Sequence, residues 1–312
     1  MDINRYSPSY GINHKHLLGL ADYSAEEIFE ILYAIKSIKG KFAAHEDTRI
    51  LQGVTVALLF GDTSMRTRSA LEIGIRQLGG VCVNLPYSEK DMQAGENFKD
   101  IVSVICRFGV GALVTRGIGR STLNEYCAVS QIPVINSTNH NEIPMQTLCD
   151  LFTIWEKKGK LEGLKIAYVG KGGSNAASLV TGAIKCGMEV AVATPKKFAL
   201  KEDAVNAALQ YGSFLITDNP AEAVRGADVI YTDGYSYHSS ISEKDLEILK
   251  PYQVNNSLMS LANHNAYFMH MLPATRGAEV TAEVIDGKNS LVLEQGENKL
   301  HTVKAVLAML IK

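Results

Sequence analysis

The segment Val54–Leu78 reads VTVALLFGDTSMRTRSALEIGIRQL. Its first part, Val54–Phe60, is apolar and rich in β-branched side chains, which favours a buried strand. From Arg66 onward the apolar residues recur at helical spacing, so a helix is expected after a short polar turn. A strand that runs directly into a helix is the repeating unit of a parallel α/β sheet.

The same alternation of short apolar runs and longer amphipathic stretches continues along the chain. It predicts strands at 54–60, 81–84, 111–115, 133–136, 165–169, 189–193, 214–217, 229–232 and 267–270. Helices are expected at 24–39, 66–78, 97–108, 144–157, 176–186, 242–250 and 298–311. The fold class is therefore α/β, with two domains that each hold a mostly parallel sheet flanked by helices, joined by bridging helices.

Local signals support some of these boundaries. Ser24 and Glu27 fit a capping box, and Pro144 suits the first turn of a helix, where its missing N–H costs nothing. We expect the domains to be 1–150 and 151–294, with the helix at 144–157 bridging them. The C-terminal helix, about 295–312, has an apolar face and is expected to pack back on the first domain.

Composition excludes several classes of protein. The chain has 31 basic and 33 acidic residues, interspersed, so no dense basic face for nucleic acid is expected. Its polar start is unlike a signal peptide, and its apolar runs are too short to cross a membrane. The five cysteines form no C-x-x-C pair and no cluster with metal-ligand spacing, which favours free thiols in a cytoplasmic protein.

The turn Gly61–Arg68 carries the first chemical signal. It places hydroxyls and two guanidinium groups at a helix start, where backbone N–H groups already favour an anion. Arg66 and Arg68 lie two residues apart, so they cannot both point the same way; one can meet the anion while the other packs or pairs. The alternative is an ordinary helix start with solvated arginines.

This motif, Ser64-Met65-Arg66-Thr67-Arg68, resembles the carbamoyl-phosphate motif S-T-R-T-R of the aspartate/ornithine carbamoyltransferase family, nearer its ornithine branch. The resemblance extends along nearly the whole chain. Further matching segments are Glu96–Asp100, Leu113–Gly117, Pro144–Gln146, Val169–Gly172, His270–Pro273 (like H-C-L-P, whose Leu-Pro bond is cis) and Glu297–Thr302.

The resemblance implies a carbamoyltransferase that moves the carbamoyl group from carbamoyl phosphate to a small amine and releases phosphate, without a metal or organic cofactor. The implied catalytic residues are Arg66, Arg116, Gln146 and Lys299. Carbamoyl phosphate would be bound by Ser64, Met65, Arg66, Thr67, Arg116, Gln146, Met271, Leu272 and Lys299. The acceptor amine would be bound by Ser174, Asp233, Tyr237 and Met271. Closure of one domain on the other would bring the reactants together.

Several positions depart from the family pattern. Two of them, Ile143 for histidine and Lys299 for arginine, replace donors to the carbamoyl oxygen, and His140 is a possible substitute donor. On the acceptor side the changed positions are Lys171, Ser174, Gly234–Ser239 and Met271. Three interpretations stay open: an altered acceptor, an ornithine enzyme with changed contacts, or a catalytically weakened carbamoyl-phosphate-binding paralogue with a regulatory role.

Two further expectations complete the sequence argument. The glycine-rich turn Gly170–Gly173 is an imperfect dinucleotide fingerprint, and the strand 189–193 that follows ends without the acid that would hold a ribose, which argues against a dehydrogenase. The polar region Tyr87–Gly95 matches the loop that reaches a neighbouring subunit in this family, so the resemblance implies a homotrimer. A mobile surface loop is an equally good interpretation of those residues.

Overall fold

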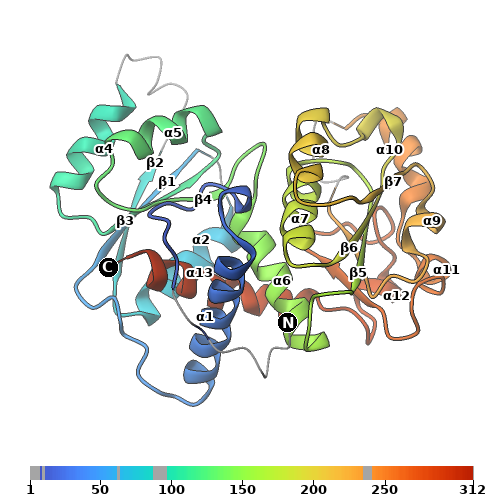
Figure 1. Ribbon diagram of the computed structural model, residues 1–312, viewed down its shortest axis with the longest axis horizontal. Coiled ribbons are helices and arrows are strands. Elements are labelled where there is room, and N and C mark those ends of the chain that lie inside the picture. The colour runs from blue at the N-terminus through green and yellow to red at the C-terminus, as the bar shows by residue number, and fades with distance from the viewer. Residues whose placement is uncertain (1–7, 9–10, 62–63, 87–96, 235–240, 312) are drawn as a thin grey trace. The chain divides into compact units, whose positions relative to one another are not determined.

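The computed structural model describes residues 8, 11–61, 64–86, 97–234 and 241–311. The chain divides into two compact units (Figure 1). We call Ser7–Phe152 together with Asn298–Lys312 the amino-terminal unit, and Thr153–Glu297 the central unit. The chain passes from one unit to the other inside helix α6 (Pro144–Lys158) and again inside helix α13 (Val292–Leu310).

The amino-terminal unit is built on a four-stranded parallel sheet with the order β2-β1-β3-β4. Its strands are β1 (Thr55–Phe60), β2 (Val81–Pro86), β3 (Ala112–Arg116) and β4 (Val134–Thr138). Its helices, besides its parts of α6 and α13, are η1 (Leu20–Asp22), α1 (Ala25–Ala43), α2 (Met65–Gln77), α4 (Phe98–Arg107) and α5 (Arg120–Val129).

Alternating side chains of these strands build a core on each face of the sheet. On one face Leu59 and Leu113 pack in a buried cluster with Val102 and Ile105 of α4 and Tyr126 of α5. The other face is also buried. Helix α1 of this unit begins at the capping box expected from Ser24 and Glu27. Both faces are therefore covered, as parallel sheets require.

The central unit repeats the architecture with a five-stranded parallel sheet of order β7-β6-β5-β8-β9. Its strands are β5 (Lys165–Val169), β6 (Glu189–Ala193), β7 (Leu215–Thr217), β8 (Val229–Thr232) and β9 (Tyr267–His270). The helices are α7 (Ser174–Lys185), η2 (Lys196–Phe198), α8 (Glu202–Leu209), α9 (Pro220–Val224), α10 (Glu243–Leu249), η3 (Lys250–Tyr252), α11 (Asn256–Met259) and α12 (Ala282–Ile285).

The predicted α/β class with two parallel sheets is confirmed, and each predicted strand is present. The predicted helices are present too, but α5, α8, α9, α11 and α12 were missed. Most of these are short, and a segment such as Pro220–Val224 offers too few turns for a helical period to show.

The start of the last helix was predicted wrongly. Helix α13 begins at Val292, not at Asn298. The later start follows from the resemblance, which places Glu297–Thr302 at the beginning of the final helix, and the low helix propensity of Gly296 agrees with it. Packing overrides that preference, because Gln295 is buried and its Oε1 accepts the backbone N–H of His270 at 3.1 Å while its Nε2 donates to the Tyr231 hydroxyl at 3.2 Å.

Helix α13 lies directly against α2 in the amino-terminal unit because of one glycine. A Cβ added at Gly74 of α2 would lie 3.2 Å from Val303 Cγ1 and 3.3 Å from Lys304 Cγ. Lys39 of α1 also reaches α13, where its Nζ donates to Asn298 Oδ1 at 2.8 Å. The α13 helix (red in Figure 1) is thus fixed beside the helix that follows β1.

Replacing Gly74 with valine should therefore destabilise the protein by about 1–3 kcal/mol, because the new side chain must displace α13. The measurement is the urea unfolding midpoint. Gly40 of α1 is the matched control, since a Cβ there meets nothing within 4 Å. Gly40→Val should be neutral or stabilising by a few tenths of a kcal/mol, roughly. Equal effects of the two changes would contradict the close α2–α13 contact.

Candidate functional site

The carboxyl ends of β1, β3 and β4 bring the expected phosphate-binding residues of the amino-terminal unit together. In the sheet register Phe60 pairs with Arg116, and the Gly61 N–H donates to the Arg116 carbonyl at 2.9 Å. The turn from β1 into α2 and the end of β3 are therefore adjacent. Ligands of open α/β sheets bind at this edge.

The first turn of α2 is open to an anion. Ser64 occupies the N-cap position, but its side chain makes no capping hydrogen bond; its hydroxyl donates to Thr67 Oγ1 at 3.1 Å. The side chain of Met65 is 78% exposed, so what this residue offers to a ligand is its backbone N–H. Uncapped N–H groups carry the positive end of the helix dipole and suit a phosphate.

The two arginines of the motif differ as expected from their spacing. Arg68 is partly buried, donates to Asn84 Oδ1 at 3.1 Å, and has its guanidinium 5.3 Å from the centroid of the Phe60 ring. Arg66 is exposed at the start of α2. The structure thus gives Arg68 a packing role and leaves Arg66 as the guanidinium at the helix start.

The loop after β4 carries Ile143, the residue that the resemblance matches to a family histidine. Ile143 is buried, 5% exposed, directly before Pro144 opens α6. Asn139 closes the preceding turn, since its Oδ1 accepts the backbone N–H groups of residues 141 and 142 at 2.9 and 2.8 Å. His140 is exposed in this turn.

Gln146 and Lys299 meet although they lie on different helices. Lys299 Nζ of α13 donates to Gln146 Oε1 of α6 at 3.1 Å, and Gln146 Nε2 donates to Asp150 Oδ1 at 2.7 Å. Asp150 is fully buried one turn after Gln146. The glutamine amide is therefore held from both ends, and its acceptor atom faces the lysine.

Burial lowers the pKa of Lys299, and the charges of Arg116 and Arg66 lower it further, while Cys149 and Asp150 act in the opposite direction. Lys299 is partly buried by exposed area. Arg66 and Arg116 thus both lie within electrostatic reach of Lys299. Such a cluster favours a multiply charged anion over water.

The central unit places the expected acceptor residues at the carboxyl ends of neighbouring strands. Ser174 opens α7 after β5, Asp233 follows β8, and Met271 and Leu272 follow β9. Because the sheet order contains β5-β8-β9, these ends share one edge. All four residues are partly buried, and Tyr237 lies outside the described residues. The expected phosphate-binding and acceptor residues therefore fall in separate units.

The segment after β9 is fixed by buried polar contacts. The Leu272–Pro273 peptide is cis, as the resemblance implied, and Leu272 has φ of 48°. The Leu272 N–H donates to His270 Nδ1 at 2.8 Å, and His270 Nε2 lies 3.6 Å from Glu279 Oε1, with both side chains fully buried. Glu279 also accepts the Thr275 N–H at 2.5 Å. This buried pair holds the loop that carries Met271 and Leu272.

Sequence reasoning missed three residues of these sites. Asp150 and Glu279 were overlooked because their partners come from tertiary contacts; only the i, i+4 spacing of Gln146 and Asp150 signalled a pair. Gly234 was overlooked as a packing residue, yet a Cβ there would lie 2.6 Å from the Pro273 carbonyl oxygen. Of the quoted motifs, residues 62–63, 87–95, Glu96 and 235–239 lie outside the described residues.

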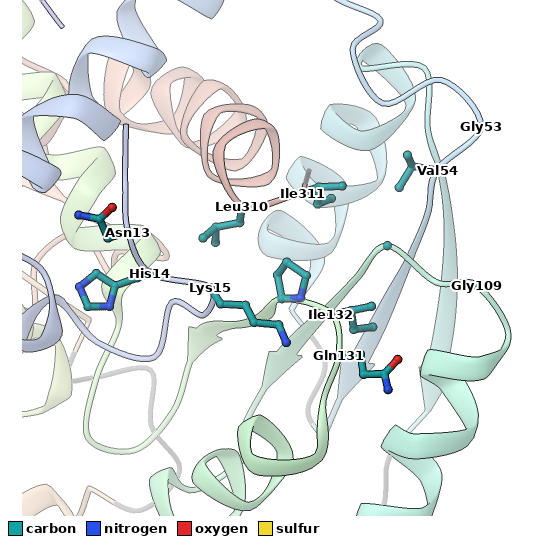
Figure 2. A pocket seen from close by; sticks show the side chains of 12 residues that line it. Asn13, His14, Lys15, Gly53, Val54, Gly109, Gln131, Ile132, Leu310 and Ile311 are labelled. Carbon is teal, nitrogen blue, oxygen red and sulfur yellow. The ribbon is translucent and has the colours of Figure 1, made fainter. Parts of the chain in front are cut away.

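A cavity of about 510 Å³ lies elsewhere in the amino-terminal unit (Figure 2). Among its lining residues, Val54, Gly111 and Pro133 precede β1, β3 and β4, so it opens at the amino ends of the strands. The sheet is parallel, which puts this cavity at the opposite edge from Ser64 and Arg116. It is separate from the candidate site.

Comparisons with known proteins match both units to one family. The family model described as the carbamoyl-P binding domain of aspartate/ornithine carbamoyltransferase matches residues 15–156, and the Asp/Orn binding domain matches residues 162–310. The chain belongs to the aspartate/ornithine carbamoyltransferase family. Two relatives that are named as ornithine carbamoyltransferases support its membership of the ornithine branch.

Similar proteins cover the chain almost completely. Ornithine carbamoyltransferase of Hyperthermus butylicus is 40% identical over 97% of this chain and 98% of its own length. The solved structure of ornithine carbamoyltransferase from Pyrococcus furiosus has a TM-score of 0.92 at 38% identity, covering 97% of this chain and 99% of that one. A structure of N-acetyl-L-ornithine transcarbamylase has a TM-score of 0.82 at 26% identity, covering 96% and 100%.

Other site types find no support in the described part of the chain. No helix there combines the length and apolar character needed to span a bilayer. No group of three histidine, cysteine or acidic side chains in those residues is arranged to hold a metal ion.

Helix α13 also contains a buried histidine that should govern acid stability. His301 of α13 is 2% exposed, and burial together with Lys304 and Lys39 lowers its pKa to about 4. In the unfolded chain this histidine has its ordinary pKa of about 6.5. The contribution of neutral His301 to the free energy of unfolding is therefore fully present above pH 6.5 and is lost as the pH falls toward 4. The decline from this one group is at most about 3 kcal/mol.

In His301→Gln the urea midpoint should therefore fall less between pH 6.5 and pH 4 than in the natural protein. Exposed His264 provides the matched control, His264→Gln, whose midpoint should follow the natural protein. Parallel curves for all three proteins would show that His301 does not titrate as described.

Proposed function

We propose that this carbamoyltransferase moves the carbamoyl group from carbamoyl phosphate to the amine of an ornithine-like amino acid or diamine, with release of phosphate. The observation that carries the proposal is the open start of α2 beside Arg66, Arg116 and Lys299. It supplies amide, hydroxyl and cationic donors for a dianion at one edge of one sheet.

The chemistry requires what these residues offer. An amine that attacks the carbamoyl carbon creates an oxyanion and then expels phosphate, so donors must face the carbonyl oxygen and cations must face the leaving group. Ser64, Thr67, Arg66 and Arg116 serve the phosphate in this proposal. Lys299 serves the carbamoyl oxygen, and Gln146 orients the carbamoyl amide. No step uses a metal or an organic cofactor.

The acceptor is bound by the central unit in this proposal, through Ser174, Asp233, Tyr237 and Met271, with Leu272 contributing its carbonyl to the carbamoyl NH₂. The half-buried carboxylate of Asp233 suits an ammonium group of the acceptor. Lys171 lies three residues before Ser174, with its Nζ 5.8 Å from the Phe198 ring centroid, and adds a cation on this side. Because a relative of the same fold is named for N-acetyl-L-ornithine, an acylated or acidic acceptor belongs among the candidates.

The regulatory alternative, a catalytically weakened paralogue, is not favoured. The relatives that cover nearly the whole chain are named as ornithine carbamoyltransferases. The replacement of the family histidine by Ile143 leaves Lys299 as a cationic donor in the same region.

The test is phosphate release from carbamoyl phosphate with a panel of amines: ornithine, putrescine, lysine, diaminopropionate, aspartate and acylated ornithines. One of the ornithine-like amines should support turnover. In Arg66→Ala the affinity for the phosphonate analogue phosphonoacetamide should fall roughly 10- to 100-fold, as expected for a lost charged hydrogen-bond donor.

Arg76 is the matched control, because it is exposed at the other end of the same helix. Arg76→Ala should bind and turn over like the natural protein. Release of phosphate with none of the amines would reject the transfer reaction, and unchanged binding in Arg66→Ala would place the phosphate site elsewhere.

We also propose a cytoplasmic homo-oligomer, a trimer by family resemblance. Strand β2 is an edge strand whose Val81 and Val83 are 61% and 45% exposed. Exposed Ile73 of α2 and Phe108, next to α4, add apolar surface in the same unit. Apolar edge strands are sites of association unless they are covered. The five free cysteines fit a reducing compartment.

Charging this edge should break the assembly. The double change Val81→Lys and Val83→Lys should reduce the sedimentation coefficient of the natural protein to that of a monomer. The control is the other exposed edge strand, β7, with Leu215→Lys and Ile216→Lys, which should stay assembled. A natural protein that sediments as a monomer at micromolar concentration would overturn the proposed assembly.

A further inference from the structure

The contact between Lys299, Gln146 and Asp150 suggests a role that a fixed guanidinium could not fill. Lys299 Nζ donates to the neutral Gln146 amide at 3.1 Å, and among the described residues no carboxylate lies within ion-pair distance of this nitrogen. Arg66 from α2 and Arg116 from β3 act on it electrostatically, as do Cys149 and Asp150 from α6. The lysine therefore lies near two arginines. The acid that opposes their effect, Asp150, contacts Gln146, which in turn contacts the lysine.

We propose that Lys299 takes up a proton from solvent when carbamoyl phosphate binds, so that the ligand itself creates the ammonium that donates to the carbamoyl oxygen. We propose in addition that Asp150 acts through Gln146 as the positioning residue for that ammonium. The step adds one proton to the Lys299 amine and changes no bond of the ligand. This inference rests on the proposed function, because it needs the dianion to bind beside Arg66 and Arg116.

The geometry explains why the free site disfavours the charged amine. Burial and two arginines oppose a third positive charge, whereas the polar contact that the structure gives Lys299 is to a neutral oxygen. A bound dianion reverses this balance by neutralising the arginines. The ammonium then has three N–H donors, of which one remains on Gln146 and two can face the ligand.

Asp150 fixes the direction of this donor. Its Oδ1 accepts Gln146 Nε2 at 2.7 Å, which turns Gln146 Oε1 toward Lys299. Without that contact the amide could rotate and present its NH₂ to the lysine, which would repel the ammonium. The negative charge of Asp150 also favours the protonated lysine.

Proton linkage gives the expected pH dependence. The pKa of free Lys299 lies below its ordinary value, and a bound dianion raises it. Between these two values binding takes up a proton, so the Kd for the ligand rises up to tenfold per pH unit as the pH increases. An enzyme with arginine at this position has no such slope, because arginine stays protonated.

The experiment is titration calorimetry of the natural protein with phosphonoacetamide between pH 7.5 and pH 10, in buffer pairs with different ionisation enthalpies. In the upper part of this range the phosphonate is a dianion in solution. The Lys299→Arg variant reports any proton change that belongs to the ligand itself, so the difference between the two proteins belongs to Lys299. We expect uptake of up to one proton in the natural protein and none in Lys299→Arg.

A second variant tests the positioning residue. Asp150→Asn keeps the size of the side chain and its acceptor oxygen but removes the charge, so the pH at which Kd begins to rise should move to a lower value. A residue with only a packing role would leave that pH unchanged. This readout is independent of the amount of activity that the variant keeps.

The outcomes separate the two proposals. Binding without proton uptake, with a Kd that is flat from pH 7.5 to pH 10, would overturn the inference and leave the proposed function standing. Uptake of the same size in Lys299→Arg would also overturn it, since the proton would belong to another group. Absence of any binding would overturn the proposed function and this inference with it.

Discussion

The convergence of cationic side chains at one edge of a sheet is the constraint around which the candidate site of the amino-terminal unit is built. Arg66, Arg116 and Lys299 come from three different elements, and the pKa of Lys299 is lowered by burial first and then by the charges of Arg116 and Arg66. Folding does not gain from this arrangement, because bringing like charges together in a partly buried region opposes stability. In the proposed function the arrangement becomes favourable when a dianion enters, so the cluster would serve ligand binding and not the stability of the fold.

The fold maintains that cluster with contacts that lie outside it. The parallel register puts the Arg116 carbonyl on the Gly61 N–H, so the end of β3 and the start of α2 cannot separate. Gly74 lets α13 approach α2, and α13 carries Lys299 to Gln146. Arg68 anchors the first turn of α2 through Asn84 and Phe60. Sheet register, one glycine and one paired arginine therefore fix the positions of groups that repel one another.

The sequence predicted much of this fold because its signals are local. Strands such as Lys165–Val169 have continuous apolar runs, and the Ser24–Glu27 capping box marks its helix start within a few residues. The early start of α13 could not be predicted, because it depends on Gln295 meeting His270 and Tyr231, which are distant along the chain. Helix propensity alone favours a start after Gly296.

The same distinction applies to the candidate site. Ser64–Arg68 could be recognised because a helix start and its donors are contiguous in sequence. The roles of Asp150 and Glu279 could not be predicted, because they depend on contacts with Gln146 and His270 that form only in the folded chain.

The two changes around the carbamoyl oxygen are best understood together. The resemblance matches Ile143 to a histidine donor, and this buried isoleucine, three residues before Gln146, offers no side-chain donor. A guanidinium in that setting would remain charged and would add a permanent third cation to Arg66 and Arg116. An amine can shed its proton, so lysine is the cationic residue that tolerates this partly buried, positively charged surrounding without a ligand. In the proposed site, isoleucine at position 143 and lysine at position 299 are thus compatible with each other.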